Sequence, residues 1–122
     1  MRKRLQALIG GLALLLTGPL VGEVLEGRVV AVTDGDTVRV LTAERIEEHV
    51  RLATIDAPER KQPFGSVSHR HLSDLVFGRD VTVDWSKRDR WGRIIGRVLV
   101  DGRDAGLEQI QAGFAWPIFN MA

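Results

Sequence analysis

The sequence GRVVAVTDGDTVRVL, residues 27–41, predicts two β-strands joined by a turn. Residues 27–32 are mostly small and β-branched, and residues 37–41 alternate polar and apolar side chains, as half-buried strands do. Asp34-Gly35-Asp36 between them is a turn sequence. We therefore expect a hairpin that ends its turn on Asp36.

The chain after this hairpin continues with short strands and two helical segments. Following a polar connection, we expect a strand over 49–55, a loop over 56–65, a helix capped by Ser66 and stopped by Gly78, strands over 81–85 and 93–100, and a helix over 105–112. The order β-β-β-α-β-β-α fits a mainly β protein, a five-stranded OB-fold barrel with helices. The pattern alone leaves another α+β arrangement open.

Length and composition limit the possibilities further. The 122 residues support one modest domain, and 44% hydrophobic residues is an ordinary globular composition. Because the chain has no Cys, disulfides, thiol catalysis and thiolate zinc sites are excluded.

The first residues have the pattern of a secretory signal. Arg2, Lys3 and Arg4 precede a mostly apolar run from Leu5 to Leu16, which is short for a membrane span. We expect residues 1–22 to be a signal peptide, or alternatively an uncleaved N-terminal anchor, and residues 23–122 to form the domain. The protein is therefore expected to be exported, secreted or periplasmic, unless residues 1–22 hold it at a membrane.

Charge is distributed unevenly along the chain. Residues 23–122 carry two more acidic than basic side chains, although the whole chain has a net charge of +1. Such a domain lacks the overall basic character of a general nucleic-acid binder. Any action on a polyanion must therefore depend on individually placed arginines.

Two carboxylates and two arginines are the candidate chemical groups. Asp36 follows a turn and Asp56 ends a strand, so they could meet at a hard-cation site, although Asp36 could also be only a turn residue. Arg51 and Arg93 could clamp a phosphate there or lie on a solvated face. Glu59 follows Asp56 across Pro58 and could accept a proton from a water molecule.

Three linked blocks of sequence resemble the signature of the staphylococcal-nuclease-like (thermonuclease) family. They are Asp34-Gly35-Asp36-Thr37-Val38, Val50-Arg51-Leu52 with Ile55-Asp56-Ala57-Pro58-Glu59, and Asp89-Arg90-Trp91-Gly92-Arg93. Gln62-Pro63-Phe64-Gly65, Asp101-Gly102-Arg103 and Gly113-Phe114-Ala115-Trp116 are similar to it as well. The resemblance covers most of residues 26–116.

The resemblance implies an OB-fold barrel that hydrolyses phosphodiesters of DNA and RNA with calcium. Asp36, Asp56 and the backbone carbonyl of Ala57 would be calcium ligands. Ala57 departs from the Thr that many members have, but a carbonyl ligand survives this change.

The same resemblance implies the catalytic groups. Glu59 would act as the general base on the attacking water, and Arg51 and Arg93 would bind the scissile phosphate and stabilise the transition state. Trp91 occupies a position where members often have an aromatic residue that contacts a nucleotide. It could stack on a base or pack against the barrel.

The resemblance fades at Pro117, where typical members continue into a third helix. We therefore carry two alternatives: a non-catalytic OB-fold module that binds nucleic acid, and a truncated relative without activity. The expected partners are DNA or RNA as substrate, with no stable protein partner, a monomeric state, and a membrane only if the leader remains.

Overall fold

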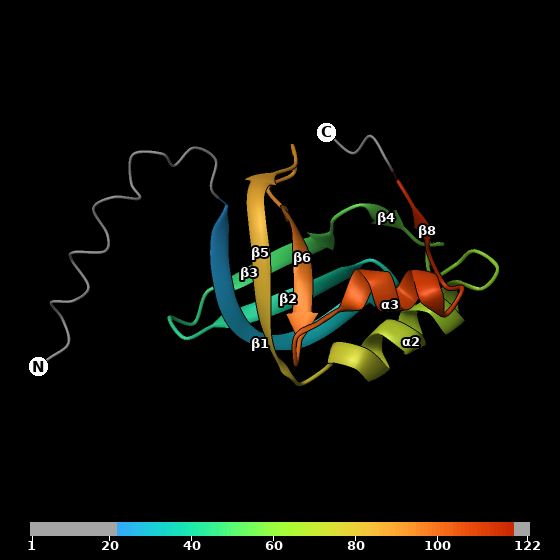
Figure 1. Cartoon of the computed structure of the whole chain (residues 1–122), viewed down its shortest axis with the longest axis horizontal. Coiled ribbons are helices and arrows are strands. Elements are labelled where there is room, and N and C mark those ends of the chain that lie inside the picture. Colours follow the sequence, from blue (N-terminus) through green and yellow to red (C-terminus); the bar gives the residue numbers. More distant parts are fainter. Residues whose placement is uncertain (1–21, 119–122) are drawn as a thin grey trace, which may run out of the picture.

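The computed structural model describes residues 22–118 (Figure 1). Residues 1–21, which contain almost all of the expected leader, and residues 119–122 lie outside the described part of the chain. The expectations about export and anchoring therefore remain predictions.

Five long strands form a closed barrel. They are β1 (Glu23–Asp34), β2 (Thr37–Thr42), β3 (Glu47–Leu52), β5 (Asp80–Arg88) and β6 (Ile94–Val100). Neighbouring strands follow the order β3-β2-β1-β5-β6, and β3 also pairs with β6 in parallel, Val50 opposite Ile94. The predicted five-stranded OB-fold barrel is confirmed.

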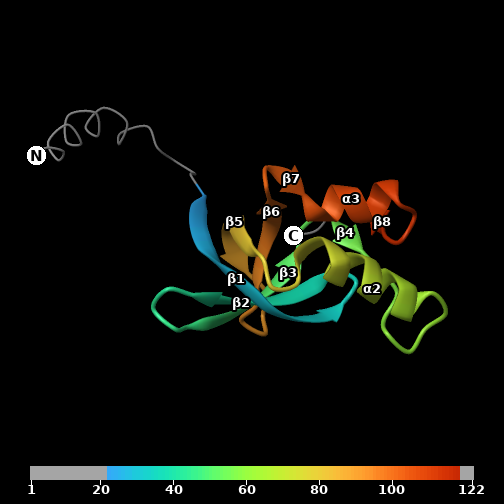
Figure 2. The same ribbon diagram turned by 90° about the horizontal axis from the view of Figure 1, so that it is seen from below.

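Two helices and three short strands complete the fold. The helices are α2 (Gly65–Val76) and α3 (Ala105–Gln111), and the short strands are β4 (Ile55–Asp56), β7 (Arg103–Asp104) and β8 (Trp116–Pro117). Both helices lie together at one end of the barrel, next to the β4–β8 pair (Figures 1 and 2). Within residues 22–118, neither helix is long and apolar enough to span a bilayer.

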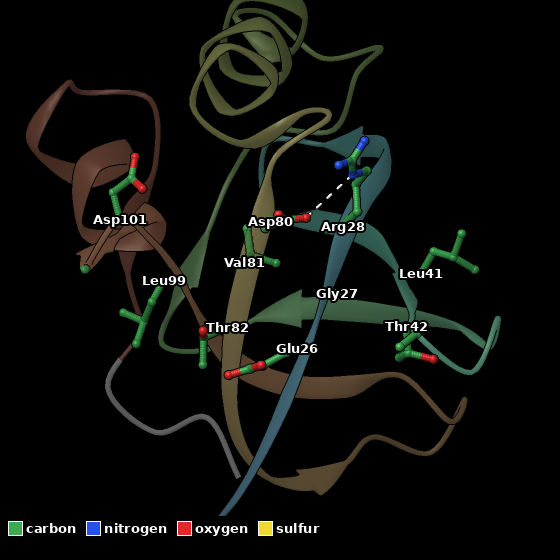
Figure 3. Close-up of a pocket in the computed structure, with 12 residues that line it drawn as sticks. Glu26, Gly27, Arg28, Leu41, Thr42, Asp80, Val81, Thr82, Leu99 and Asp101 are labelled. Atoms are coloured by element: carbon green, nitrogen blue, oxygen red, sulfur yellow. Dashed lines mark ion pairs between the residues drawn. The ribbon is translucent and has the colours of Figure 1, made fainter.

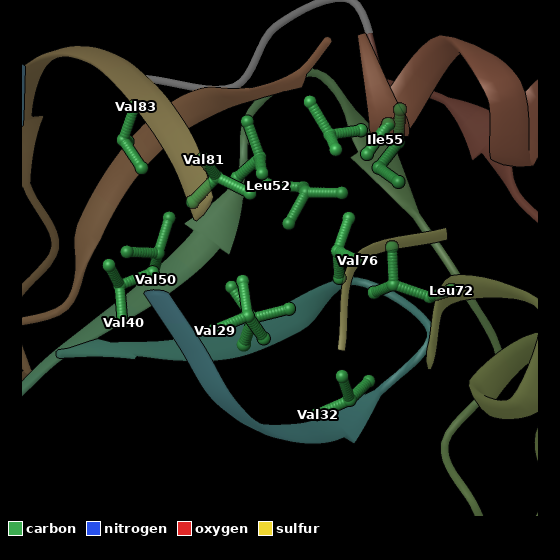
Figure 4. Packing of buried hydrophobic residues seen from close by; sticks show 14 of the residues in the cluster. Val29, Val32, Val40, Val50, Leu52, Ile55, Leu72, Val76, Val81 and Val83 are labelled. Carbon is green, nitrogen blue, oxygen red and sulfur yellow. The ribbon is translucent and has the colours of Figure 1, made fainter. Parts of the chain in front are cut away.

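The core is built mainly from valines that alternate along the strands. Val29, Val38, Val40, Val50, Val83 and Val98 are fully buried, as expected when one face of each strand points into a barrel. Leu72 and Val76 of α2 approach the strand valines and cover that end of the barrel (Figure 4).

The expected strand over 49–55 is wrong in its second half. The chain turns at Ala53 and Thr54, and Thr54 has a positive φ of 66°. Ile55 and Asp56 form the separate strand β4, which pairs with Pro117 and Trp116 of β8. A pair of two-residue strands has no periodicity that a sequence could reveal, so neither was predicted.

The expected Ser66 cap is also wrong, because α2 begins earlier. Phe64 is the N-cap residue, with φ 66° and no side-chain cap hydrogen bond, and Ser66 lies inside the helix. Gly65 explains this start, because a Cβ there would lie 1.9 Å from the carbonyl oxygen of Glu59. Tertiary packing of the preceding loop therefore sets the helix start and overrides the capping preference.

The fourth strand is longer than expected. The chain over 86–88 was expected to be part of a loop, but β5 continues to Arg88, which lies opposite Ile94. Pairing with β6 thus extends β5 through polar residues that have no strand periodicity of their own.

A buried glutamine ties the hairpin turn to both helices. Gln109 of α3 is fully buried, and its Nε2 donates to the carbonyl oxygens of Gly35 at 2.8 Å and Ser68 at 3.1 Å. Its Oε1 contacts Nδ1 of His71, and Ser68 Oγ donates to the carbonyl oxygen of Phe114 at 2.8 Å. A Cβ on Gly35 would lie 1.9 Å from Ser68 Oγ, so the turn before Asp36 rests directly on α2.

Replacing Gln109 with leucine should lower the free energy of unfolding by about 3 kcal/mol, because several buried polar groups would lose their hydrogen-bond partner. The control is Gln111→Leu, at an exposed position of the same helix. Urea denaturation of both variants measures the difference. Equal effects of the two substitutions would contradict the structural role of Gln109.

Candidate active site

Asp36 and Asp56 converge on the guanidinium of Arg51. Nη2 of Arg51 lies 3.1 Å from Oδ1 of Asp56 and 3.5 Å from Oδ2 of Asp36. The predicted meeting of the two carboxylates is therefore observed, and Arg51 lies between them rather than on a solvated face.

The strand register explains how Arg51 reaches this position. Its neighbours Val50 and Leu52 are buried in the barrel, so its side chain points to the opposite face. Arg51 pairs with Thr37, the residue after Asp36, and the turn after β3 brings Ile55 back to it. Nη1 of Arg51 donates to the carbonyl oxygens of Leu52 at 2.9 Å and Ile55 at 2.8 Å.

The backbone amide of Ala57 holds the two carboxylates together. It lies 3.1 Å from Oδ2 of Asp36 and 3.1 Å from Oδ1 of Asp56. Thr37 Oγ1 donates to the other oxygen of Asp36 at 2.8 Å. Asp36 is thus fixed from three sides, while the side chain of Asp56 stays 42% exposed.

Burial raises the pKa of Asp36. The Arg51 guanidinium, the Thr37 hydroxyl and the Ala57 amide lower this pKa, and the Asp56 charge raises it again, but burial prevails. A raised folded-state pKa means that the protonated form favours folding, so the fold loses stability as the pH rises through that pKa. Ionisation of the buried Asp36 therefore costs free energy in the folded protein, and a cation bound at the site would offset part of this cost.

Asp36 and Asp56 could provide some of the ligands of a hard cation, and other oxygen atoms would have to provide the rest. Two carboxylates beside one guanidinium leave a net negative charge, and oxygen donors suit Ca²⁺. Within residues 22–118, no three His, Cys, Asp or Glu side chains group as a metal cluster. Carbonyl, water or substrate oxygens would have to complete the coordination.

Glu59 lies on the loop after this cluster. Its side chain is exposed and has no hydrogen-bond or ion-pair partner among the described residues. Its backbone amide donates to Oε1 of Gln62 at 2.7 Å, which shapes the loop. A free carboxylate on a shaped loop is available to accept a proton.

Arg93 is held by Asp89 rather than by Asp36 or Asp56. Nε of Arg93 donates to Oδ2 of Asp89 at 2.7 Å. Its terminal nitrogens have no polar partner in the part of the chain that is described, and so remain available to a ligand. Arg93 directly precedes β6, whose Ile95 pairs with Arg51, so strand alternation places both arginines on the same face.

Trp91 does not pack against the barrel. Its ring is 69% exposed, with the guanidinium carbon of Arg90 4.7 Å and that of Arg93 5.6 Å from the ring centroid. The exposed ring is available for stacking, whereas Trp85 is partly buried against the core.

Asp89 is a positioning residue that the sequence analysis did not single out. Its Oδ1 accepts the backbone N–H groups of Trp91 and Arg93, both at 2.9 Å. Burial alone would raise the pKa of Asp89, but the bonds from Arg93 and the two amides outweigh it and lower this pKa. Its stabilising effect is therefore present at neutral pH and is lost only as the pH falls through that lowered pKa.

Replacing Asp89 with alanine should release Arg93 and the 89–93 loop, reducing any reaction that uses Arg93 by about ten- to a hundredfold through misplacement. Asp89→Asn, which keeps the Oδ1 acceptor, should fall between wild type and alanine. Initial rates of the three proteins measure this, with Asp84→Asn as a control on the exposed face of β5. Identical rates in all of them would rule out the positioning role.

A large hollow of the surface lies away from these residues. It is about 710 Å³, between β1, β2, β5 and the end of β6, and contains the exposed ion pair of Arg28 with Asp80 at 3.5 Å (Figure 3). Its lining includes neither Asp36, Asp56 nor the two arginines. The size of a hollow therefore does not identify the candidate active site. The cluster of buried charged groups identifies it.

Comparison with known proteins gives one consistent family. The family described as staphylococcal nuclease homologue matches residues 49–122. An Escherichia coli protein named "Uncharacterized endonuclease" is 44% identical over 93 residues, which cover 75% of this chain and 60% of that protein. This chain thus spans less than two thirds of that relative.

Two further relatives are covered more completely. A Shigella flexneri protein named "Micrococcal nuclease" is 36% identical over 121 residues, covering 92% of this chain and 68% of that protein. The Escherichia coli "Protein ParB" is 35% identical over 128 aligned positions, covering 95% of this chain and 72% of that protein.

Proposed function

Because this chain belongs to the staphylococcal nuclease family, we propose that it hydrolyses phosphodiester bonds of DNA or RNA. The observation that carries the proposal is the arrangement of Arg51 between Asp36 and Asp56. A guanidinium group next to a carboxylate pair that can bind a cation is suited to a phosphodiester. Its negative oxygens can contact the guanidinium and the bound cation together.

The side chains divide the reaction between them. Arg51 and Arg93 bind the scissile phosphate and neutralise the charge that grows on its oxygens in the transition state. Glu59 takes a proton from the attacking water, whose oxygen bonds to phosphorus as the bond to the leaving sugar oxygen breaks. The leaving oxygen receives a proton from solvent. Ca²⁺, held by Asp36, Asp56 and the Ala57 carbonyl, would supply polarisation of a phosphoryl oxygen.

Hydrolysis of heat-denatured DNA by the purified protein tests this proposal. Cleavage that requires calcium, stops with a chelator and is lost in Arg93→Ala supports a calcium-dependent nuclease. A folded protein that binds DNA without cleaving it would instead support the non-catalytic binding module.

Calcium should also stabilise the protein against unfolding. At about 100 times its dissociation constant, a ligand that binds only the folded state adds about 2.7 kcal/mol. Asp36→Asn should abolish this gain, whereas Asp80→Asn, at an exposed position remote from the site, should retain it. Thermal unfolding with and without calcium measures both. If calcium still stabilised Asp36→Asn, the calcium ion would have to bind at another site.

We further propose that the protein is exported. The basic residues Arg2, Lys3 and Arg4 before the apolar run support this, as they do in secretory signals. Fractionation of cells that express the full chain, with the N-terminus of the product sequenced, distinguishes a cleaved leader from a membrane anchor.

A further inference from the structure

An aromatic cleft lies beside the candidate active site. It is a hollow of about 320 Å³, and its lining includes the rings of Phe64, Phe114 and Trp116. The remaining lining residues are Pro58, Gln62, Pro63 and Gly113. No step of the proposed reaction uses these residues.

Two of the rings are unusually exposed. Phe64 is 76% exposed and Trp116 is 51% exposed. Phe64 also has a positive φ of 66° at the N-cap of α2, a conformation that bulky residues rarely adopt and that costs about 1–3 kcal/mol. The exposed faces of these two rings are therefore available to contact a ligand.

The cleft is lined by residues that neighbour the carboxylate site in the chain and in the β4–β8 pair. Trp116 is the strand partner of Asp56 in the β4–β8 pair, and Pro58 directly follows Ala57. A polynucleotide whose phosphate contacts Arg51 would therefore pass an apolar, aromatic surface immediately next to that contact.

The charges around the cleft favour the same kind of ligand. Arg60 and Lys61 lie on the exposed loop between Pro58 and Phe64, and neither side chain forms an ion pair within residues 22–118. The amide of Arg60 donates to Asp34 at 3.2 Å, which ties this loop to the end of β1. Free cations beside exposed rings are the combination that binds single-stranded nucleic acid, phosphates on the cations and bases on the rings.

We propose that this cleft is a nucleobase subsite, in which a base of a single-stranded polynucleotide stacks on Phe64 and Trp116. The inference rests on the proposed function, since the phosphate of the same strand is the one that contacts Arg51. A paired base in a duplex is not free to enter the cleft, so the subsite favours single-stranded over double-stranded substrate.

The test measures binding without cleavage. A short fluorescent oligothymidylate is titrated with the full chain in the presence of a chelator, and anisotropy gives the dissociation constant. Phe64→Asn, which tolerates the positive φ, and Trp116→Ala should each weaken binding by about tenfold, the scale of one lost base–aromatic stack. The control is Phe77→Asn, which removes an exposed Phe from the other end of α2.

Oligonucleotides with a single abasic position identify the base. For the wild type, one abasic position should weaken binding by a similar factor, and this loss should disappear in Phe64→Asn and Trp116→Ala. Trp116→Phe should restore most of the effect. A duplex of the same sequence should bind the wild type and both variants equally.

The outcomes separate the subsite from the nuclease. If the wild type cleaves DNA but the two variants, shown by circular dichroism to be folded, bind every oligonucleotide as it does, the subsite is wrong and the proposed function stands. If the wild type binds with this aromatic dependence but never cleaves, the subsite stands and the proposed hydrolysis is wrong. A folded wild type that binds no oligonucleotide and also fails to cleave DNA with calcium overturns both.

Discussion

Replacing Arg51 with alanine is expected to reduce phosphodiester cleavage by at least about 10²- to 10³-fold, the scale of losing one preorganised donor to a developing negative charge. The Nη2 atom of Arg51 contacts both carboxylates, and its other terminal nitrogen anchors the turn through Leu52 and Ile55. No neighbouring cation in the described residues makes the same contacts.

Arg51→Lys sharpens this prediction. Lysine keeps the positive charge but lacks the planar fork, so it cannot contact both carboxylates and both carbonyls at once. We expect Arg51→Lys to retain more stability than Arg51→Ala but to recover little activity. Specific rates at saturating calcium measure the effect on catalysis.

Loss of folding must be separated from loss of chemistry in these variants. Removing the partner of a largely buried carboxylate destabilises a protein by about 3–5 kcal/mol. Rates are therefore normalised to the folded fraction from circular dichroism. The control is Arg97→Ala, because Arg97 forms only exposed ion pairs, with Asp84 at 3.5 Å and Asp104 at 3.6 Å. Equal activity of folded Arg51→Ala and Arg97→Ala would remove Arg51 from the mechanism.

Replacing Glu59 with glutamine should give the second large effect, a loss of about 10² to 10⁴ in the rate of cleavage through removal of the general base. Glutamine has nearly the same shape but no carboxylate to accept a proton. The side chain of Glu59 is exposed and unpartnered within residues 22–118, so the fold should be unaffected, within about 0.5 kcal/mol.

This separation of activity from stability makes Glu59→Gln a decisive variant. The dissociation constant for an oligonucleotide should stay near that of the wild type, while the rate falls. Glu44→Gln, at an exposed position of the turn between β2 and β3, is the matched control and should change neither. A Glu59→Gln variant that cleaves at the wild-type rate would assign the proton transfer to another group.

Much of the barrel was predictable because its strands repeat a local pattern. In β2 and β3, the buried pairs Val38/Val40 and Val50/Leu52 each flank one less buried residue, and this alternation indicates which face is buried. Asp34-Gly35-Asp36 marks a turn by its residue types alone. The same alternation puts Arg51 on the face opposite the buried Val50 and Leu52.

Features set by individual contacts, rather than by a repeating pattern of side chains, were not predictable in this way. Phe64 begins α2 because Gly65 packs on the carbonyl of Glu59, and the pair of β4 with β8 joins residues about half the chain apart. The role of Asp89 depends on three hydrogen bonds that form only when its loop closes. The sequence contains Asp89, but no local pattern distinguishes it from an ordinary surface aspartate.

The sequence by itself thus determined most of the strands, their buried faces and the identity of the charged groups, because strand periodicity and residue chemistry are local properties. Only the tertiary structure decided that Asp36 and Asp56 share one guanidinium and one amide, that Arg93 is held by Asp89, and that Phe64 and Trp116 border a common cleft. The physical reason is that these arrangements consist of individual hydrogen bonds, ion pairs and packing contacts, several of them between residues far apart in sequence, and such contacts form only in the folded chain.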